Sequence, residues 1–215
     1  MAEEKTNRRT ADALKAIEDA VFSLLEEKEF EHVTARDICQ RAKVNKMTFY
    51  KYHNNKYDAL AKAFTSRLNA EYKAIIVDFD HLYKDDMDEA HYQGLMFVLD
   101  FFERYRVAFS HLVSSSGDFP RDVVFSALFA NYLPFFSAVI GEEINHSNEY
   151  LVHFIFGAYR SLFECQLRQL AQSPNGEFDR EAAEKACRLI AKSFTMILLT
   201  LRKEHEDKVE NKSIS

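Results

Sequence analysis

Glycine and proline are scarce in this sequence, and neither occurs before Gly94. The 215 residues contain only 5 glycines and 3 prolines, whereas the two residues together usually make up roughly 12% of a chain. Hairpins and tight turns depend on these residues, so their scarcity predicts an all-α protein. The hydrophobic fraction of 47% is sufficient for a buried core and excludes a disordered chain.

The cysteines and the apolar runs predict a reduced, cytoplasmic protein with no membrane partner. The three cysteines are odd in number and form no CxxC pair, which favours free thiols over disulfides. The longest apolar stretch, residues 128–140, contains Asn131 and Pro134. It is shorter than the ~20 residues that a membrane-spanning helix needs.

Charge is distributed unevenly along the chain. The net charge is −6, yet residues 34–62 contain seven lysines and arginines against two aspartates. Phe49, Tyr50, Tyr52 and Tyr57 lie within this basic block. A basic patch with interleaved aromatics is typical of nucleic-acid binding, although a solvated helix face also accounts for the count.

Capping residues and apolar periodicity predict four helices in the first 82 residues. The first is amphipathic and covers about residues 8–28. Thr34, with Asp37 three residues later, predicts the start of a short second helix. Asn45 predicts another short helix at residues 46–52, and Asn55 a long one ending near residue 82. Two short helices joined by a tight turn form a helix-turn-helix.

Helical periodicity continues through the remaining residues, giving about nine helices in all. Aromatic and other apolar residues from Phe97 to Leu112 predict one helix. A second helix is predicted to begin at residues 118–120 and to be kinked by Pro134. A third helix, at about residues 143–170, carries two apolar stripes, and a last helix covers about residues 180–202. The polar tail at residues 203–215 is expected to fray.

A specific residue pattern runs through the predicted helix-turn-helix. It reads Phe30-x-x-Val33-Thr34-x-x-Asp37-Ile38, then Ala42-x-Val44-Asn45-Lys46-x-Thr48-Phe49-Tyr50-x-Tyr52, then Asn55-Lys56-x-x-x-Leu60. The pattern resembles the DNA-binding domain of the TetR/AcrR family of bacterial transcription regulators over roughly residues 10–64. The resemblance implies a three-helix helix-turn-helix DNA-binding domain at residues 1–64. It also implies a C-terminal helical effector and dimerisation domain at residues 65–215.

The resemblance also implies which residues face DNA. In a helix-turn-helix, the second short helix enters the major groove. Its first turns make the base contacts in this family, while Thr34 and Lys56 match phosphate anchors and Arg36 matches a position that reaches a base. Phe49 is expected to point into the core. The implied DNA-binding residues are Thr34, Arg36, Lys46, Met47, Thr48, Tyr50, Lys51, Tyr52 and Lys56.

The sequence departs from the family pattern at four positions. Glu29, Lys43 and Met47 stand where the family commonly has glycine. A left-handed backbone at Lys43 would cost about 1–2 kcal/mol. His53 replaces a large apolar residue, and we expect a packed, hydrogen-bonded histidine there, with a pH sensor as the alternative.

Aromatic stripes in the C-terminal part fit an effector pocket and a filled core equally well. The pocket would hold a small apolar or aromatic molecule and be lined by Phe97, Phe101, Tyr105, Phe125, Phe129, Tyr132 and Phe156. The double-striped helix and the last helix fit a homodimer with a four-helix interface. The interface would contain Leu151, Phe154, Ala158, Leu162, Ile190, Phe194, Ile197 and Leu201, and the stripe that faces the partner stays open.

These observations predict a repressor that a small effector releases from a palindromic operator. The alternatives are a TetR-like activator or a regulator controlled by a protein partner. An enzyme is more remote, because the sequence lacks HExxH, GxSxG and phosphate-binding glycine motifs. We expect no cofactor and no metal, since His146, Glu149 and His153 form only a weak metal-ligand pattern.

Overall fold

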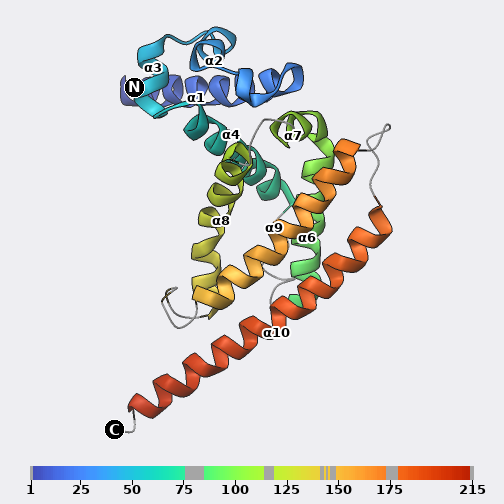
Figure 1. Ribbon diagram of the computed structural model, residues 1–215. Coiled ribbons are helices and arrows are strands. Elements are labelled where there is room, and N and C mark those ends of the chain that lie inside the picture. The colour runs from blue at the N-terminus through green and yellow to red at the C-terminus, as the bar shows by residue number, and fades with distance from the viewer. Residues whose placement is uncertain are drawn as a thin grey trace. The chain divides into compact units, whose positions relative to one another are not determined.

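The computed structural model describes residues 2–75, 85–113, 119–140, 143, 145, 149–172 and 179–213 (Figure 1). These residues form helices and no strand, which confirms the predicted all-α class. The chain divides into two compact units. Unit 1 comprises residues 1–71 and 104–128, and unit 2 comprises residues 72–103 and 129–215. This division differs from the predicted boundary at residue 64, because residues 104–128 return to the N-terminal unit.

The first helix begins at Ala2 rather than near residue 8, and the three α-helices after it begin where their capping residues predict. Helix α1 (Ala2–Glu27) is followed by the short 3₁₀ helix η1 (Phe30–His32), α2 (Ala35–Ala42), α3 (Lys46–Tyr52) and α4 (Lys56–Ile75). At the start of α2, Thr34 Oγ1 accepts from the Asp37 amide at 3.1 Å, and Asp37 accepts from the Thr34 amide at 2.9 Å. This is the predicted capping box. The predicted extension of the fourth helix to residue 82 lies outside the described residues.

The core of unit 1 holds the short helices against α1 and α4. Ile17, Ile38, Phe49 and Leu60 are all fully buried, which confirms the predicted inward orientation of Phe49. Burying such side chains stabilises the domain by roughly 1.5–3 kcal/mol each. Helix α7 (Arg106–Val113) belongs to the same unit, since His111 Nδ1 lies 2.7 Å from the Leu25 carbonyl oxygen of α1.

The prediction of a single helix from Phe97 to Leu112 is wrong, because the structure contains two helices there. Helix α6 (Met87–Arg104) ends one residue before α7 begins, and Tyr105 is the turn between them. The Tyr105 hydroxyl donates to Glu71 Oε1 at 2.5 Å, and Arg104 also forms an ion pair with Glu71. A one-residue break leaves the 3.6-residue periodicity almost unchanged, so the apolar pattern could not reveal it.

Unit 2 contains α6, the second half of α8 (Phe119–Ile140), α9 (Glu149–Gln172) and α10 (Arg180–Ser213). Helix α8 begins at the predicted start signal and continues through Pro134. Helix α9 begins six residues later than predicted. The expectation of a frayed tail is wrong, because α10 continues to Ser213. Polar i,i+4 pairs support this extension, such as Arg202 and Glu206, whose Nε and Oε1 atoms lie 3.0 Å apart.

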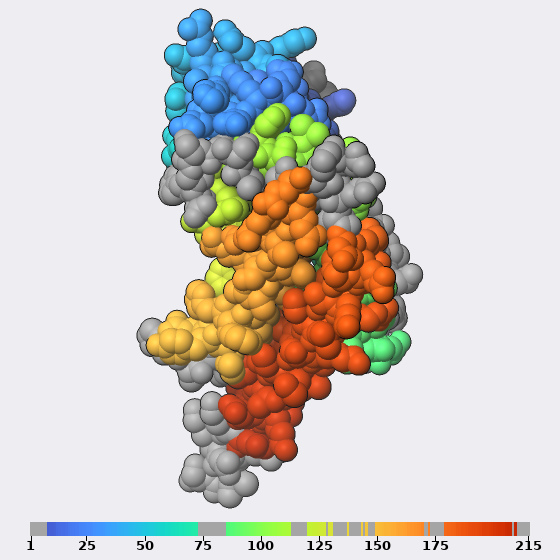
Figure 2. Space-filling view, turned by 45° about the vertical axis from the view of Figure 1, so that its right-hand side comes forward, coloured from blue at the N-terminus to red at the C-terminus, as the bar shows by residue number. Residues whose placement is uncertain are grey.

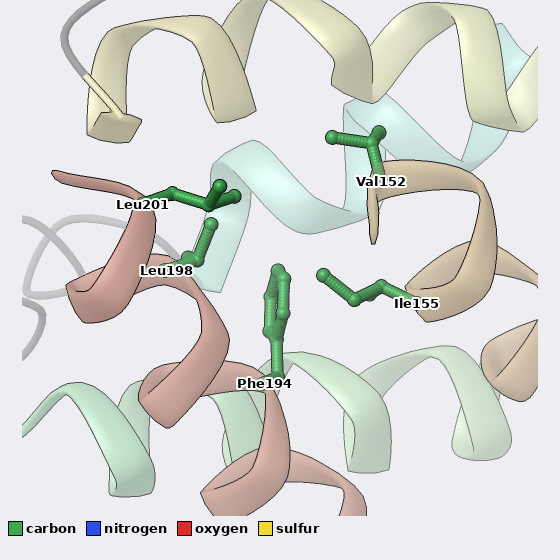
Figure 3. Close-up of a cluster of buried hydrophobic side chains, with 5 residues drawn as sticks. All are labelled: Val152, Ile155, Phe194, Leu198 and Leu201. Atoms are coloured by element: carbon green, nitrogen blue, oxygen red, sulfur yellow. The ribbon is translucent and has the colours of Figure 1, made fainter. Parts of the chain in front are cut away.

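A buried cluster joins α9 to α10 in unit 2 (Figure 3). Val152 and Ile155 of α9 point toward Phe194, Leu198 and Leu201 of α10 (Figure 3), and all five side chains are buried. Phe194 and Leu201 were expected in a dimer interface, but they are buried within the chain. The last helix therefore uses its predicted stripe for intramolecular packing. None of the described helices is long and apolar enough to cross a membrane.

Candidate nucleic-acid interface

The turn between α2 and α3 is fixed by backbone hydrogen bonds and one left-handed residue. Lys43 adopts φ 55° and ψ 36°, the conformation that glycine usually provides at this position in the family. The Val44 amide donates to the Cys39 carbonyl oxygen at 3.0 Å. Asn45 then caps α3, and its Oδ1 accepts from the Thr48 amide at 2.7 Å. These contacts fix the direction in which α3 leaves the turn.

Helix α3 presents a polar and aromatic face to solvent. The Met47 side chain is 85% exposed and that of Tyr50 is 55% exposed. Lys46 and Lys51 are also exposed, and Thr48 is half-buried. Phe49 holds the opposite face of the helix in the core. Except for Arg36 of α2, the predicted base-contacting residues therefore share one accessible helix, whose size suits the major groove.

Internal contacts divide the basic block into two groups. Arg41 pairs with Glu27, and Lys62 Nζ donates to Asp58 Oδ2 and to the Tyr52 carbonyl oxygen, both at 2.9 Å. A second group has exposed side chains, and within the described part of the chain no ion pair joins these residues to a carboxylate. This group, which we call the exposed cations, consists of Arg36, Lys43, Lys46 and Lys51. They place positive charge around α3, and positive charge attracts the phosphates of nucleic acids.

Two further predicted DNA-binding residues have structural partners. Thr34 is exposed and belongs to the capping box of α2. The Tyr52 hydroxyl lies 3.1 Å from Thr10 Oγ1 of α1, and this hydrogen bond lowers the pKa of Tyr52. The ammonium of Lys51 lies 5.2 Å from the centroid of the Tyr52 ring. Tyr52 therefore joins α3 to α1 and also lies beside Lys51, one of the exposed cations.

Lys56 does not extend its ammonium into solvent. Its Nζ donates to the carbonyl oxygens of Phe30 at 3.0 Å, Glu31 at 3.1 Å and Val33 at 2.9 Å. Burial lowers the pKa of this lysine. The observed position of Lys56 therefore differs from that expected of a phosphate anchor. Its three N–H groups are directed at backbone oxygens rather than outward.

His53 is packed but not hydrogen-bonded, so that part of the prediction is wrong. The ring lies 5.3 Å from the Phe49 ring, and the side chain is almost completely buried. Neither ring nitrogen has a hydrogen-bond partner among the described residues, and Nδ1 is 3.9 Å from Asp58 Oδ2. Burial lowers the pKa of His53 and favours its neutral form.

The predicted effector residues are divided between the two units of the structure. Phe129 and Phe156 of unit 2 meet edge to face at 4.0 Å, and Phe97 lies 5.3 Å from Tyr72. Tyr105 belongs to unit 1, where it contacts Glu71. Phe101 is buried in α6, Phe125 is half-buried in the unit 1 part of α8, and the Tyr132 side chain lies outside the described residues.

Buried polar side chains in unit 2 were missed by the sequence reasoning. Gln166 of α9 donates from Nε2 to the Leu99 carbonyl oxygen at 3.1 Å, while its Oε1 has no partner in the part of the chain described. His91 Nδ1 lies 3.0 Å from Thr195 Oγ1, and burial lowers the pKa of His91 to about 4. Gln166 lies three residues after Phe163 and directly before Leu167, both buried on α9, so a polar residue beside an apolar stripe was the available signal.

Comparison with known proteins identifies the N-terminal segment. Residues 17–63 match the family described as bacterial regulatory proteins, tetR family. Residues 17–63 are therefore a tetR-family segment. The match covers α2, α3 and the exposed cations.

A solved structure is also similar to this chain. It is a TetR transcriptional regulator from Streptococcus agalactiae 2603V, with 18% sequence identity and a TM-score of 0.49. The similarity covers 88% of this chain and 98% of that chain. No curated protein sequence matches the chain. Among the described residues, no group of three or more histidine, cysteine or acidic side chains is placed to hold a metal ion, and His146 lies outside them.

Proposed function

We propose that this protein is a non-enzymatic tetR-family repressor that binds a palindromic operator as a homodimer. A small apolar or aromatic effector would bind unit 2 and release the protein from DNA. The observation that carries the proposal is the exposed face of α3, which includes Lys46, Met47 and Tyr50. The other exposed cations add positive charge to this surface. Such a surface combines groove contacts with phosphate attraction.

Helix α3 is expected to read the operator through its first turns. Lys46 donates hydrogen bonds, and a lysine on a major-groove helix can pair with guanine O6 and N7. Met47 offers an apolar surface to a thymine methyl group, and the Tyr50 hydroxyl can reach a phosphate. One seven-residue helix contacts few base pairs. A second copy related by a two-fold axis doubles the site and makes it palindromic.

An exposed apolar face on α9 and α10 supports the homodimer. Leu151 and Phe154 of α9 are exposed, with Phe154 at 67%. Leu189, Met196 and Leu199 of α10 are exposed as well. Figure 2 shows α9 and α10 side by side on one face of unit 2. Covering these side chains with the same two helices of a second copy would form a four-helix interface.

This interface revises the predicted set of dimer residues. Phe194 and Leu201 are excluded because they pack inside the chain. Leu151 and Phe154 stay in the proposed interface. Leu189, Met196 and Leu199 join it, although the sequence did not predict them there. The remaining predicted interface residues have half-buried side chains, and they are Ala158, Leu162, Ile190 and Ile197.

The interior of unit 2 indicates the chemical class of an effector. Its buried polar side chains among the described residues are His91, Gln166 and Thr195. The low pKa of His91 keeps that residue neutral near pH 7. The rings of His91 and Phe194 lie 4.2 Å apart, and Gln166 Oε1 can accept one hydrogen bond. A neutral, mostly apolar molecule with one donor group fits this environment.

Selection of random duplex DNA by the purified protein tests the proposal. The selected sequence should be palindromic, and a dimer should bind it. Tyr50→Ala and Lys46→Ala should weaken binding at fixed salt, whereas Lys185→Ala, an exposed lysine of α10 in unit 2, is the matched control. Equal and weak binding of every sequence by wild type and variants would overturn sequence-specific recognition.

A further inference from the structure

We infer that Lys56 is a positioning residue that joins the start of α4 to the entry of the helix-turn-helix, and that it does not contact a DNA phosphate. This inference rests on the proposed function, because it concerns how the DNA-binding surface is held. The resemblance implied the opposite role for Lys56. The geometry of its ammonium group decides between the two.

The ammonium of Lys56 has three N–H groups, and the structure gives it three acceptors. The Phe30, Glu31 and Val33 carbonyl oxygens lie 2.9–3.1 Å from Nζ. These carbonyls belong to η1 and to Val33, which follows it, and the Phe30 carbonyl oxygen also accepts from the Val33 amide at 3.0 Å. A phosphate contact would require the lysine to give up these bonds.

The surroundings of Lys56 also favour an inward position. Nζ lies 4.7 Å from the centroid of the Phe30 ring and 5.4 Å from that of the Tyr57 ring. Phe30 and Val33 are almost completely buried. The lysine therefore lies against two aromatic faces and a buried backbone segment, where its charge is satisfied by carbonyl dipoles and ring faces.

The three bonds connect elements that are distant in sequence. Lys56 is the first residue of α4, and the carbonyl oxygens belong to residues 23 to 26 positions earlier. Val33 is followed directly by Thr34, the N-cap of α2. Lys56 thus fixes the position of α2 relative to the start of α4. A displacement of the start of α4 would move η1 and α2 with it, and α3 follows through the short turn.

The salt dependence of operator binding separates the two roles. Each phosphate contact that is lost lowers the slope of log affinity against log salt by about one unit. We expect Lys56→Met to weaken operator binding by roughly tenfold, because the carbonyl groups lose their partner, while the slope stays unchanged. The matched control is Lys51→Met, which removes an exposed cation from α3 and should lower the slope.

Nitrogen NMR of the lysine ammonium groups in the full-length wild-type protein gives an independent readout. The Lys56 signal should show slow proton exchange without DNA, because its protons are hydrogen-bonded. It should keep its chemical shift when the selected operator is added, whereas the Lys51 signal should move. This measurement does not depend on whether Lys56→Met folds.

Three outcomes would overturn the inference. They are a slope lowered by about one unit per subunit in Lys56→Met, a Lys56 signal that shifts on adding operator, and unchanged affinity together with an unchanged slope. Failure of the proposed function looks different. In that case Tyr50→Ala and Lys51→Met would also bind DNA like the wild type.

Discussion

Arg41 of α2 and Glu27 of α1 form a bidentate ion pair, with Nη1 2.8 Å from Oε1 and Nη2 2.7 Å from Oε2. The same guanidinium also donates to Ser23 of α1. The pair lowers the pKa of Glu27 through its hydrogen bond to Arg41. It removes one cation of the basic block from the surface offered to DNA and uses it to fix α2 against α1.

Arg41→Ala should lower the melting temperature of the protein slightly and leave the salt slope of DNA binding unchanged. The pair is at the surface, so added salt should shrink the difference in melting temperature between variant and wild type. Arg36→Ala is the matched control, because Arg36 is an exposed cation of the same helix. That variant should keep its melting temperature and lower the slope. A lowered slope in Arg41→Ala would show that Arg41 contacts phosphate.

Lys43→Gly should stabilise unit 1. Lys43 is the one non-glycine residue with positive φ among the described residues, and this conformation costs about 1–2 kcal/mol. Glycine removes the strain but makes the unfolded chain more flexible, so we expect a net gain of about 0.5–1 kcal/mol in the free energy of unfolding. Urea denaturation measures it. Lys43→Ala keeps the strained backbone and loses the charge, so a gain of equal size in that variant would assign the effect to charge.

Phe154→Glu and Met196→Glu should each convert the protein to a monomer at micromolar concentration. Both side chains are about two-thirds exposed, at 67% and 65%, and belong to the proposed interface of α9 and α10. A charge buried there without a partner opposes association. Sedimentation equilibrium measures the assembly, and Phe154→Leu and Met196→Leu are the apolar controls. Dimers in both glutamate variants would place the interface elsewhere.

Stability should fall with acid because His91 is buried in unit 2. Its pKa is about 4 in the folded protein, against 6.5 for an ordinary histidine. The unfolded state therefore binds a proton at higher pH than the folded state, so stability is lost as the pH falls from 6.5 toward 4. Between about pH 7 and about pH 5, we expect a loss of about 2 kcal/mol.

Urea denaturation of wild type and His91→Gln at the two pH values measures this effect. Glutamine keeps a polar side chain beside Thr195, the partner of His91 Nδ1, and does not titrate. The acid-dependent loss should be smaller in the variant by the contribution of His91. His53 has a lowered pKa as well and contributes in the same direction, so some pH dependence should persist in His91→Gln. An identical loss in both proteins would contradict the assignment to His91.

The beginnings of the short helices were predictable because their signals are local. Thr34 and Asp37 are three residues apart, as are Asn45 and Thr48, and their hydrogen bonds form within one helical turn. The left-handed turn at Lys43 was also predictable from the family pattern. The environment of His53 was only half predicted, because burial follows from its position, whereas partners for its nitrogens depend on residues packed around it.

By itself, the sequence determined the all-α class, the capped helix-turn-helix and the family that its pattern resembles. The tertiary structure decided which face of each helix is buried. Helix α9 has two apolar stripes, so periodicity alone could not choose between packing on α10 and packing on a second copy. The tertiary structure also decided which cations stay exposed. The partners of Arg41 and Lys56 lie 14 to 26 residues away in the sequence, so only folding brings them within hydrogen-bond range.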